Sequence, residues 1–265
     1  MNRQLYEQAF QECVLDGGYN CNRLELFDVT DSTNEEISKI AMKGAPEGSL
    51  AVAAKQTSGQ GRNGRNFFSP DGGNLYMSFL LRPVSSTPLN LLTPAAAVAV
   101  ARAIDEVCNK KVSIKWVNDI FYNEKKVCGI IAKAYNVGQP TMYIVIGIGV
   151  NVHMTTEEIP ADIKSFGTLY NLGENTDEYL IPRLCAAIYS EYMNIYNDLD
   201  DLDFMKEYKE KSLVIGKEVS YLAGDKEAIV KVVDIDLDGG LVVEDENHER
   251  KTYKDGEIRI SILEQ

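Results

Sequence analysis

The stretch Gln56-Thr-Ser-Gly-Gln-Gly-Arg-Asn-Gly-Arg65 decides between the fold classes open to this chain. Its glycines at 59, 61 and 64 have the spacing of the dinucleotide-binding fingerprint, which must open a helix. Here the next residues, 66–73, read Asn-Phe-Phe-Ser-Pro-Asp-Gly-Gly and cannot start one. No GxxxxGK[ST] motif occurs anywhere either. The stretch therefore predicts a long loop and argues against a dinucleotide-binding fold and a P-loop enzyme. Its glycines and two arginines fit an anion-binding loop, and equally a solvated surface loop.

The hydrophobic pattern on both sides of this loop alternates between strand and helix periods. Ser32 and Glu35 fit a capping box at the start of a helix, and Pro94 suits the first turn of another. The expected strands are 24–30, 49–55, 74–81, 112–116, 119–122, 126–135 and 142–152. Further helices are expected at 176–197 and at about 202–211.

Beyond Leu213 the pattern changes to short β runs. They are expected at 219–222, 228–234, 240–244, 251–253 and 258–262. Such a series suggests a small barrel of roughly 50 residues. We therefore expect two domains, residues 1–212 and 213–265.

Composition narrows the classes of function. The 265 residues are 45% apolar and 25% charged, as in a folded globular protein. Five scattered cysteines without a CxxC pair indicate free thiols in a reducing, cytoplasmic compartment, and two histidines leave little room for His/Cys zinc chemistry. Neither a signal peptide nor a membrane span is expected.

Charge is unevenly distributed along the chain. Residues 1–154 hold 15 Lys and Arg against 14 Asp and Glu, whereas the remainder is strongly acidic and brings the net charge to −13. An acidic half repels nucleic acid and anionic membranes, so neither is expected as a partner. An anionic small molecule is expected to bind the near-neutral front half.

Four further clusters have a composition that suits ligand binding, and each also has a structural explanation. Ser32-Thr33-Asn34 offers hydroxyls to a polar ligand, or only caps a helix. Lys115-Trp-Val-Asn-Asp119 ends an apolar strand, where a lysine could stabilise phosphate charge or simply mark a strand edge. Lys126-Val-Cys-Gly129 and Gly147-Ile-Gly149-Val-Asn151 put glycine inside strands, which indicates close approach of a ligand or tight sheet packing.

Together, in this order, the clusters resemble the biotin–protein ligase family, from about Leu24 to the chain end, including Asp255-Gly256-Glu257-Ile258. The resemblance implies an α+β fold: a mixed β-sheet catalytic domain of the class II synthetase type flanked by helices, followed by a small C-terminal SH3-like β barrel. It implies that biotin reacts with Mg-ATP to give biotinoyl-5′-AMP. A lysine of a biotin carboxyl carrier protein domain then displaces AMP.

The resemblance also assigns roles to residues. Lys115 and Arg62 are the implied catalytic residues. The implied biotin site comprises Ser32, Thr33, Asn34, Gln56, Gly59, Gln60, Gly61, Arg62, Phe67, Lys126, Gly129 and Gly147. The implied ATP site comprises Arg62, Arg65, Lys115, Trp116, Asn118 and Asn151. Asp119 is left open between binding the metal ion and orienting a lysine.

The sequence departs from the family pattern at Gln60, Phe67, Val117 and Cys128, where Arg or Lys, Trp, Pro and Ala are usual. Only about 23 residues precede the first expected strand, too few for a DNA-binding domain of roughly 60. A ligase without DNA binding is expected, with a homodimer possible. A ligase for lipoate or another acyl acid and a non-catalytic biotin sensor are the alternatives.

Overall fold

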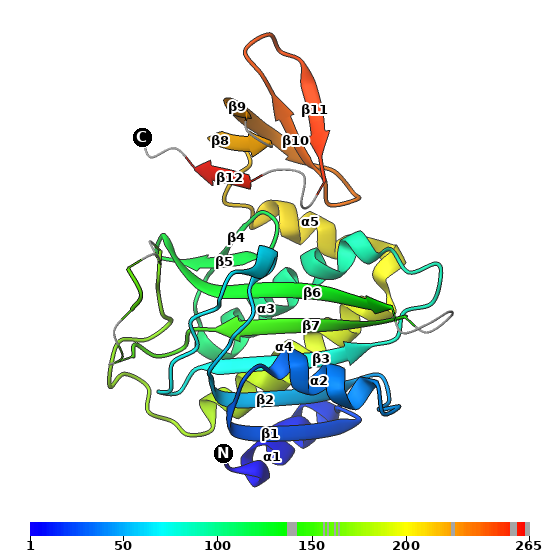
Figure 1. Cartoon of the computed structure of the whole chain (residues 1–265), viewed down its shortest axis with the longest axis vertical. Helices are drawn as coiled ribbons and strands as arrows, with labels where there is room; N and C mark the ends of the chain where they lie inside the picture. The colour runs from blue at the N-terminus through cyan, green and yellow to red at the C-terminus, as the bar shows by residue number, and fades with distance from the viewer. Residues whose placement is uncertain are drawn as a thin grey trace.

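A seven-stranded mixed sheet forms the framework of the larger part of the protein in the computed structural model of the chain (Figure 1). The structure describes residues 1–136, 142–155, 157, 159–161, 163, 165–223, 226–254 and 259–262. The strands lie in the order β1 (Arg23–Thr30), β2 (Ser49–Gln56), β3 (Leu75–Leu81), β7 (Met142–Val150), β6 (Lys125–Asn136), β5 (Asp119–Tyr122) and β4 (Ser113–Lys115). Strands β1 and β2 are parallel and the other neighbours antiparallel.

Helices cover the two faces of this sheet unequally. Helices α3 (Leu92–Cys108) and α4 (Leu180–Asn197), both largely buried, lie behind the sheet in Figure 1, whereas α2 (Thr33–Ala41) lies in front of β2 and β3. Helix α5 (Asp203–Glu210) packs on α3. Short 3₁₀ turns occur at η1 (Arg62–Gly64), η2 (Leu89–Leu91) and η3 (Leu199–Asp201). The face of the sheet on which α2 lies is therefore only partly covered by helices, which leaves room for a site.

Helix α1 (Arg3–Leu15) was not expected from the sequence. Its buried residues Tyr6, Ala9 and Phe10 recur at helical spacing and pack on α4, where the rings of Phe10 and Tyr189 meet edge to face with centroids 5.6 Å apart. The apolar face spans only these few positions in a polar segment, which is why its period was not recognised.

The C-terminal strands form a separate five-stranded antiparallel sheet in the order β11 (Arg250–Tyr253), β10 (Leu241–Glu244), β9 (Lys226–Ile235), β8 (Glu218–Ala223) and β12 (Arg259–Ile262). This confirms the α+β class and the series of short strands. The family-like segment 255–258 lies outside the described residues. The chain enters this sheet through residues 211–213, which pair with Ile114 of β4 through two backbone hydrogen bonds of 2.8 Å.

Two local expectations need correction. Helix α4 begins at Leu180, later than the expected residue 176. Ser32 occupies the N-cap of α2 with extended backbone, but its side chain makes no capping hydrogen bond and Glu35 binds Gln60 instead. The expected capping box is therefore absent: neither of its two hydrogen bonds forms. Among the described helices none combines the length and apolar character needed to cross a membrane.

Candidate functional site

A cavity of about 690 Å³ opens between the sheet, the start of α2 and the glycine-rich loop. Residues 59–67 of that loop, here called the flap, fold back on themselves: Phe67 N donates to Gly59 O and Gly61 N donates to Arg65 O, both at 2.8 Å. Turn η1 forms the tip. Of the sequence-predicted residues, the cavity is lined by Thr33, Asn34, Gln56, Gln60, Gly61, Arg62, Arg65, Phe67, Lys115, Trp116, Asn118, Asp119, Lys126, Gly129 and Gly147.

A row of buried polar side chains forms one end of the cavity. Thr33 Oγ1 lies 2.7 Å from Ser78 Oγ, and Ser78 donates to Asn34 Oδ1 at 3.0 Å. Gln56 Oε1 accepts from Thr33 N at 2.9 Å, and its Nε2 donates to Ser69 Oγ. These groups can rearrange to donate to and accept from a neutral polar ligand without facing it with a charge.

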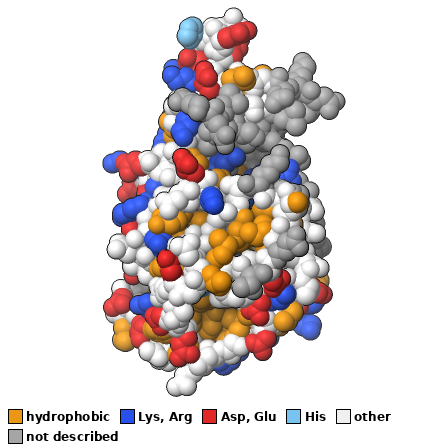
Figure 2. All heavy atoms as spheres, turned by 90° about the vertical axis from the view of Figure 1, so that its left-hand side faces the viewer, with side chains coloured by type: hydrophobic (Ala, Val, Ile, Leu, Met, Phe, Trp, Pro, Cys, Tyr) orange, Lys and Arg blue, Asp and Glu red, His pale blue; other side chains and the backbone are white. Residues whose placement is uncertain are grey.

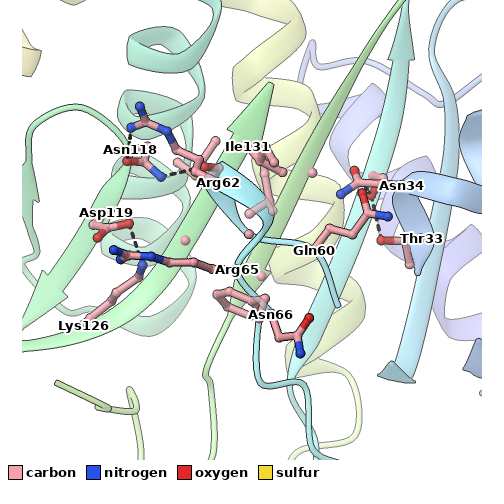
Figure 3. A pocket seen from close by; sticks show the side chains of 18 of the residues that line it. Thr33, Asn34, Gln60, Arg62, Arg65, Asn66, Asn118, Asp119, Lys126 and Ile131 are labelled. Carbon is pink, nitrogen blue, oxygen red and sulfur yellow. Dashed lines mark hydrogen bonds and ion pairs between the residues drawn. The ribbon is translucent and has the colours of Figure 1, made fainter. Parts of the chain in front are cut away.

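Cationic side chains gather at the other end, as Figure 3 shows for the labelled residues. Arg62 Nη1 donates to Asn118 Oδ1 at 2.8 Å, and Asn118 Nδ2 in turn donates to Ile130 O at 2.7 Å. Lys126 Nζ lies 2.7 Å from Asp119 Oδ1. Among the described lining residues, four cations thus face a single carboxylate, an arrangement that suits an anion.

Lys115 projects from the end of β4, where it pairs in register with Asp119 of β5. Burial lowers the pKa of Lys115 from its ordinary value; the Asp119 carboxylate opposes this shift and the Lys126 ammonium adds to it. A poorly solvated ammonium beside the cavity interacts strongly with any negative charge that develops there.

The strand glycines leave room for the protein's own side chains. A Cβ atom on Gly129 would lie 2.8 Å from Phe67 Cε2, and one on Gly149 would collide with the same ring. A Cβ on Gly147 would collide with the Asn34 amide. The sequence indicated that something lies against this face, and the structure identifies it as the flap phenyl ring and the first turn of α2.

Trp116 connects the cavity to the C-terminal sheet. Its indole Nε1 donates to Gly239 O at 2.9 Å, and Asn90 Nδ2 donates to Asp238 O at 2.8 Å. Gly239 has a φ of +77°, so glycine suits this tight turn between β9 and β10. A wall of the cavity therefore depends on a turn of the second sheet.

Three predicted site residues lie outside the cavity lining. Ser32 is buried, and its Oγ has no hydrogen-bond partner in the part of the chain that the structure describes. Gly59 allows close contact with Phe67 O and Ser69 Oγ within the loop. Asn151 Nδ2 donates to Gly167 O at 3.1 Å and ties down the segment after β7. The structure does not bring these three residues into the cavity lining, and their binding roles stay predictions.

Sequence reasoning missed seven lining residues: Asn66, Met77, Ser78, Ile130, Ile131, Ile148 and Gly149, although Gly149 had been noted as a strand glycine. Ser78 offered a signal, because it is the one polar residue in the buried strand β3. The isoleucines offered none, because they resemble any other core residue in a strand.

Metal ligands are scarce. The described residues contain no group of three or more His, Cys, Asp or Glu side chains suited to a metal ion. Asp119, the single acidic residue of the described lining, is paired with Lys126. A Mg²⁺ ion would therefore have to be held mainly by oxygens of a bound anion, and Asp119 would be the carboxylate of the described lining that could contribute a protein oxygen.

The outer face formed by the loops at one end of the main sheet appears in Figure 2. It presents patches of hydrophobic side chains with both signs of charge scattered around them. Phe68 and Phe166 from two of these loops meet edge to face, with centroids 6.0 Å apart. The concentration of positive charge in the cavity is thus a local feature.

Comparison with known proteins agrees with this geometry. Residues 26–151 match the sequence profile of the Biotin/lipoate A/B protein ligase family. The bifunctional ligase/repressor BirA of Bacillus subtilis is 40% identical over 144 residues, covering 53% of this chain and 44% of the relative. The chain thus spans less than half the length of that relative.

Two other matches extend over nearly the whole chain. The biotin–[acetyl-CoA-carboxylase] ligase of Mycobacterium tuberculosis is 28% identical over 250 residues, covering 91% of this chain and 90% of the relative. The Aquifex aeolicus biotin protein ligase in complex with biotin and ATP has a TM-score of 0.70 at 29% identity, covering 91% of this chain and all of that one. In fold and in sequence, over about nine tenths of its length, this chain is thus similar to biotin protein ligases.

Proposed function

We propose that the protein activates biotin with ATP to biotinoyl-5′-AMP and then transfers biotin to a lysine of a biotin carboxyl carrier protein domain. The observation that carries this proposal is the division of one cavity into a neutral polar end and a cationic end. Biotin has the same division, because a neutral ureido ring and a carboxylate sit at opposite ends of an apolar frame. The names of the relatives support the same assignment.

In this proposal the ureido ring binds the polar row. Thr33, Gln56 and Ser78 supply hydroxyl and amide groups, and the apolar side chains of Met77, Ile130 and Ile148 contact the ring system and its tail. No charged side chain belongs to the row, so the uncharged ring loses little on leaving water.

In the first step a biotin carboxylate oxygen attacks the α-phosphorus of ATP and pyrophosphate leaves. Both reactants are anions, so the cations at that end bring them together and balance the charge on the phosphorus centre. Lys115 and Arg62 are the residues proposed for this role, with Lys126 beside the carboxylate and Arg65 nearer the distal phosphates. A Mg²⁺ ion carried by ATP would neutralise phosphate charge.

In the second step the carrier lysine amine attacks the acyl carbon of the mixed anhydride, and AMP leaves with the bonding electron pair. Water would compete for the same carbon. The Phe67 ring lines the cavity beside Gly129 and Gly149, and in this proposal it helps to exclude water before the carrier arrives. The open edge of β1 is the proposed docking strand for the carrier, through backbone pairing.

We also propose that the chain divides into two functional parts at residue 212 and that it forms a homodimer. A cytoplasmic location is proposed because its five cysteines are free.

The decisive test of activity is biotin-dependent exchange of pyrophosphate into ATP, followed by mass spectrometry of a carrier domain incubated with the protein, biotin and ATP. Lipoate in place of biotin is the matched control. Folded protein that shows no exchange with biotin contradicts the proposal, and exchange with lipoate alone reassigns the substrate.

A further inference from the structure

Both ends of the Gln60 side-chain amide are held by charged residues. Its Nε2 donates to Glu35 Oε1 at 2.7 Å, and its Oε1 accepts from Lys133 Nζ at 3.3 Å. Lys133 Nζ also lies 3.9 Å from Glu35 Oε1. Only one orientation of the amide satisfies both partners, so the pair fixes the direction of the side chain as well as its position.

The two charged residues belong to separate elements that border the cavity. Glu35 belongs to the first turn of α2 and Lys133 to β6, while Gln60 belongs to the flap. In Figure 3 Gln60 points toward Thr33 and Asn34, away from Arg62 and Arg65 at the other end of the cavity. The flap is thus held at two places, through Gln60 on one side and through the hydrogen bond of Arg62 on the other.

The two anchors differ in their relation to the ligand. Arg62 and its partner Asn118 both line the cavity, so a bound anion would compete for the arginine. Glu35 and Lys133 lie outside the lining, with about 41% and 42% of their side chains exposed. Gln60 itself lines the cavity, whereas the two charged residues that hold it do not.

We propose that Glu35 and Lys133 are positioning residues that hold the flap, through Gln60, over the bound acid and its acyl adenylate, and so set how long that intermediate is retained. The inference rests on the function proposed above. A neutral amide here connects two opposite charges, so the flap is held without an added charge at position 60.

Limited proteolysis with trypsin tests the flap without any ligand. Glu35→Ala and Lys133→Met are each expected to speed cleavage after Arg62 or Arg65 about threefold to tenfold, the range for loss of one half-exposed hydrogen bond. Cleavage sites are assigned by mass spectrometry. Two controls are matched to these variants. Glu36→Ala removes the neighbouring acidic residue of α2 and leaves Glu35 in place, and Lys43→Met removes an exposed lysine away from the cavity. Both should be cleaved at the parent rate.

A double-mutant cycle identifies Gln60 as the link. In a Gln60→Ala background, Glu35→Ala and Lys133→Met should add nothing further, because the side chain that they hold is gone. Unchanged cleavage in the single variants, or a full additional effect in the Gln60→Ala background, overturns the proposal.

Enzyme assays then measure the consequence. The single variants should release pre-formed biotinoyl-5′-AMP about threefold to tenfold faster and raise the KM for biotin by a similar factor, with kcat within about twofold. Lys133→Arg keeps the donor and should restore parent-like retention. Faster cleavage without faster adenylate release refutes the retention role. A parent protein without biotin-dependent exchange contradicts the proposed function, while the proteolysis result still reports on the flap.

Discussion

Replacing Lys115 by Met is the sharpest test of how the cavity works. The lysine pairs in register with Asp119 and lines the cationic end, and no other residue reaches the cavity from β4. Loss of a preorganised charge next to a reacting oxyanion costs about 10²- to 10³-fold in rate. We expect Lys115→Met to reduce biotin adenylation by that factor, which is about 3–4 kcal/mol in the activation barrier.

Stability should change in the opposite direction. Burial lowers the pKa of Lys115, so the folded-state pKa lies below the unfolded one. The protonated lysine therefore destabilises the folded state at every pH below the folded pKa, and this penalty disappears as pH rises through the unfolded pKa. Methionine carries no charge and removes the penalty. At neutral pH the variant should melt at the parent temperature or above it.

The same shift gives the pH dependence of the reaction. Adenylation needs the ammonium form, so its rate should decline as pH rises through the lowered pKa of Lys115. Lys115→Arg retains a cation that does not deprotonate in this range, and its alkaline decline should move to higher pH. Pyrophosphate exchange from neutral pH to about pH 10 measures both effects.

Lys111→Met is the matched control, because Lys111 is exposed and pairs with Asp105 away from the cavity. It should leave exchange unchanged. The reasoning would be refuted if Lys115→Met lost less than about tenfold in exchange. It would also fail if Lys115→Met melted well below the parent, since the lysine would then be a structural residue.

Three further substitutions test other parts of the structure. Gly149→Ala places a methyl group against the Phe67 ring, so we expect a loss of about 1–3 kcal/mol in unfolding free energy and a higher KM for biotin; an unchanged KM would mean that the ring does not need this space. Asp236→Ala removes the carboxylate that accepts from two backbone N–H groups in the turn that binds the Trp116 indole. The KM for ATP should therefore rise about threefold to tenfold. A KM for ATP equal to that of the parent protein would show that the turn does not affect the ATP site. Phe10→Ala should cost about 3–5 kcal/mol in denaturant unfolding with kcat of the folded fraction unchanged, whereas a selective loss of kcat would connect α1 to the site.

Several parts of the site could be predicted because their residues are close in sequence and chemically unusual. A loop with glycines and arginines, a lysine next to a tryptophan, and glycines inside apolar strands stand out against any background. The structure brings these segments to one cavity. Ser32 and Asn151 belong to the same segments yet lie outside it, because adjacent residues in a strand or at a cap face different directions.

Other features depend on packing between distant segments and left little trace in the sequence. Ser78 and Ile148 line the cavity because β3 pairs with β7. Ser78 stands out only as a polar residue in an apolar strand, and nothing in the neighbourhood of Ile148 marks it as a ligand contact. Helix α1 forms because its few apolar residues find α4, which follows it by more than 160 residues. Local propensity alone is weak for so short an amphipathic helix.

The sequence by itself determined the order of most elements and the chemical types available for the reaction, because periodicity and residue chemistry are local properties; the class of fold followed from the resemblance of its motifs to a family. Only the tertiary structure decided which groups these side chains contact. It placed the Phe67 ring and the Asn34 amide against the strand glycines, paired Asp119 with Lys126, and set Gln60 between two opposite charges. All of these contacts except the Asp119–Lys126 pair join segments far apart in the chain, and the sheet register and helix packing that bring them together result from the folding of the whole molecule.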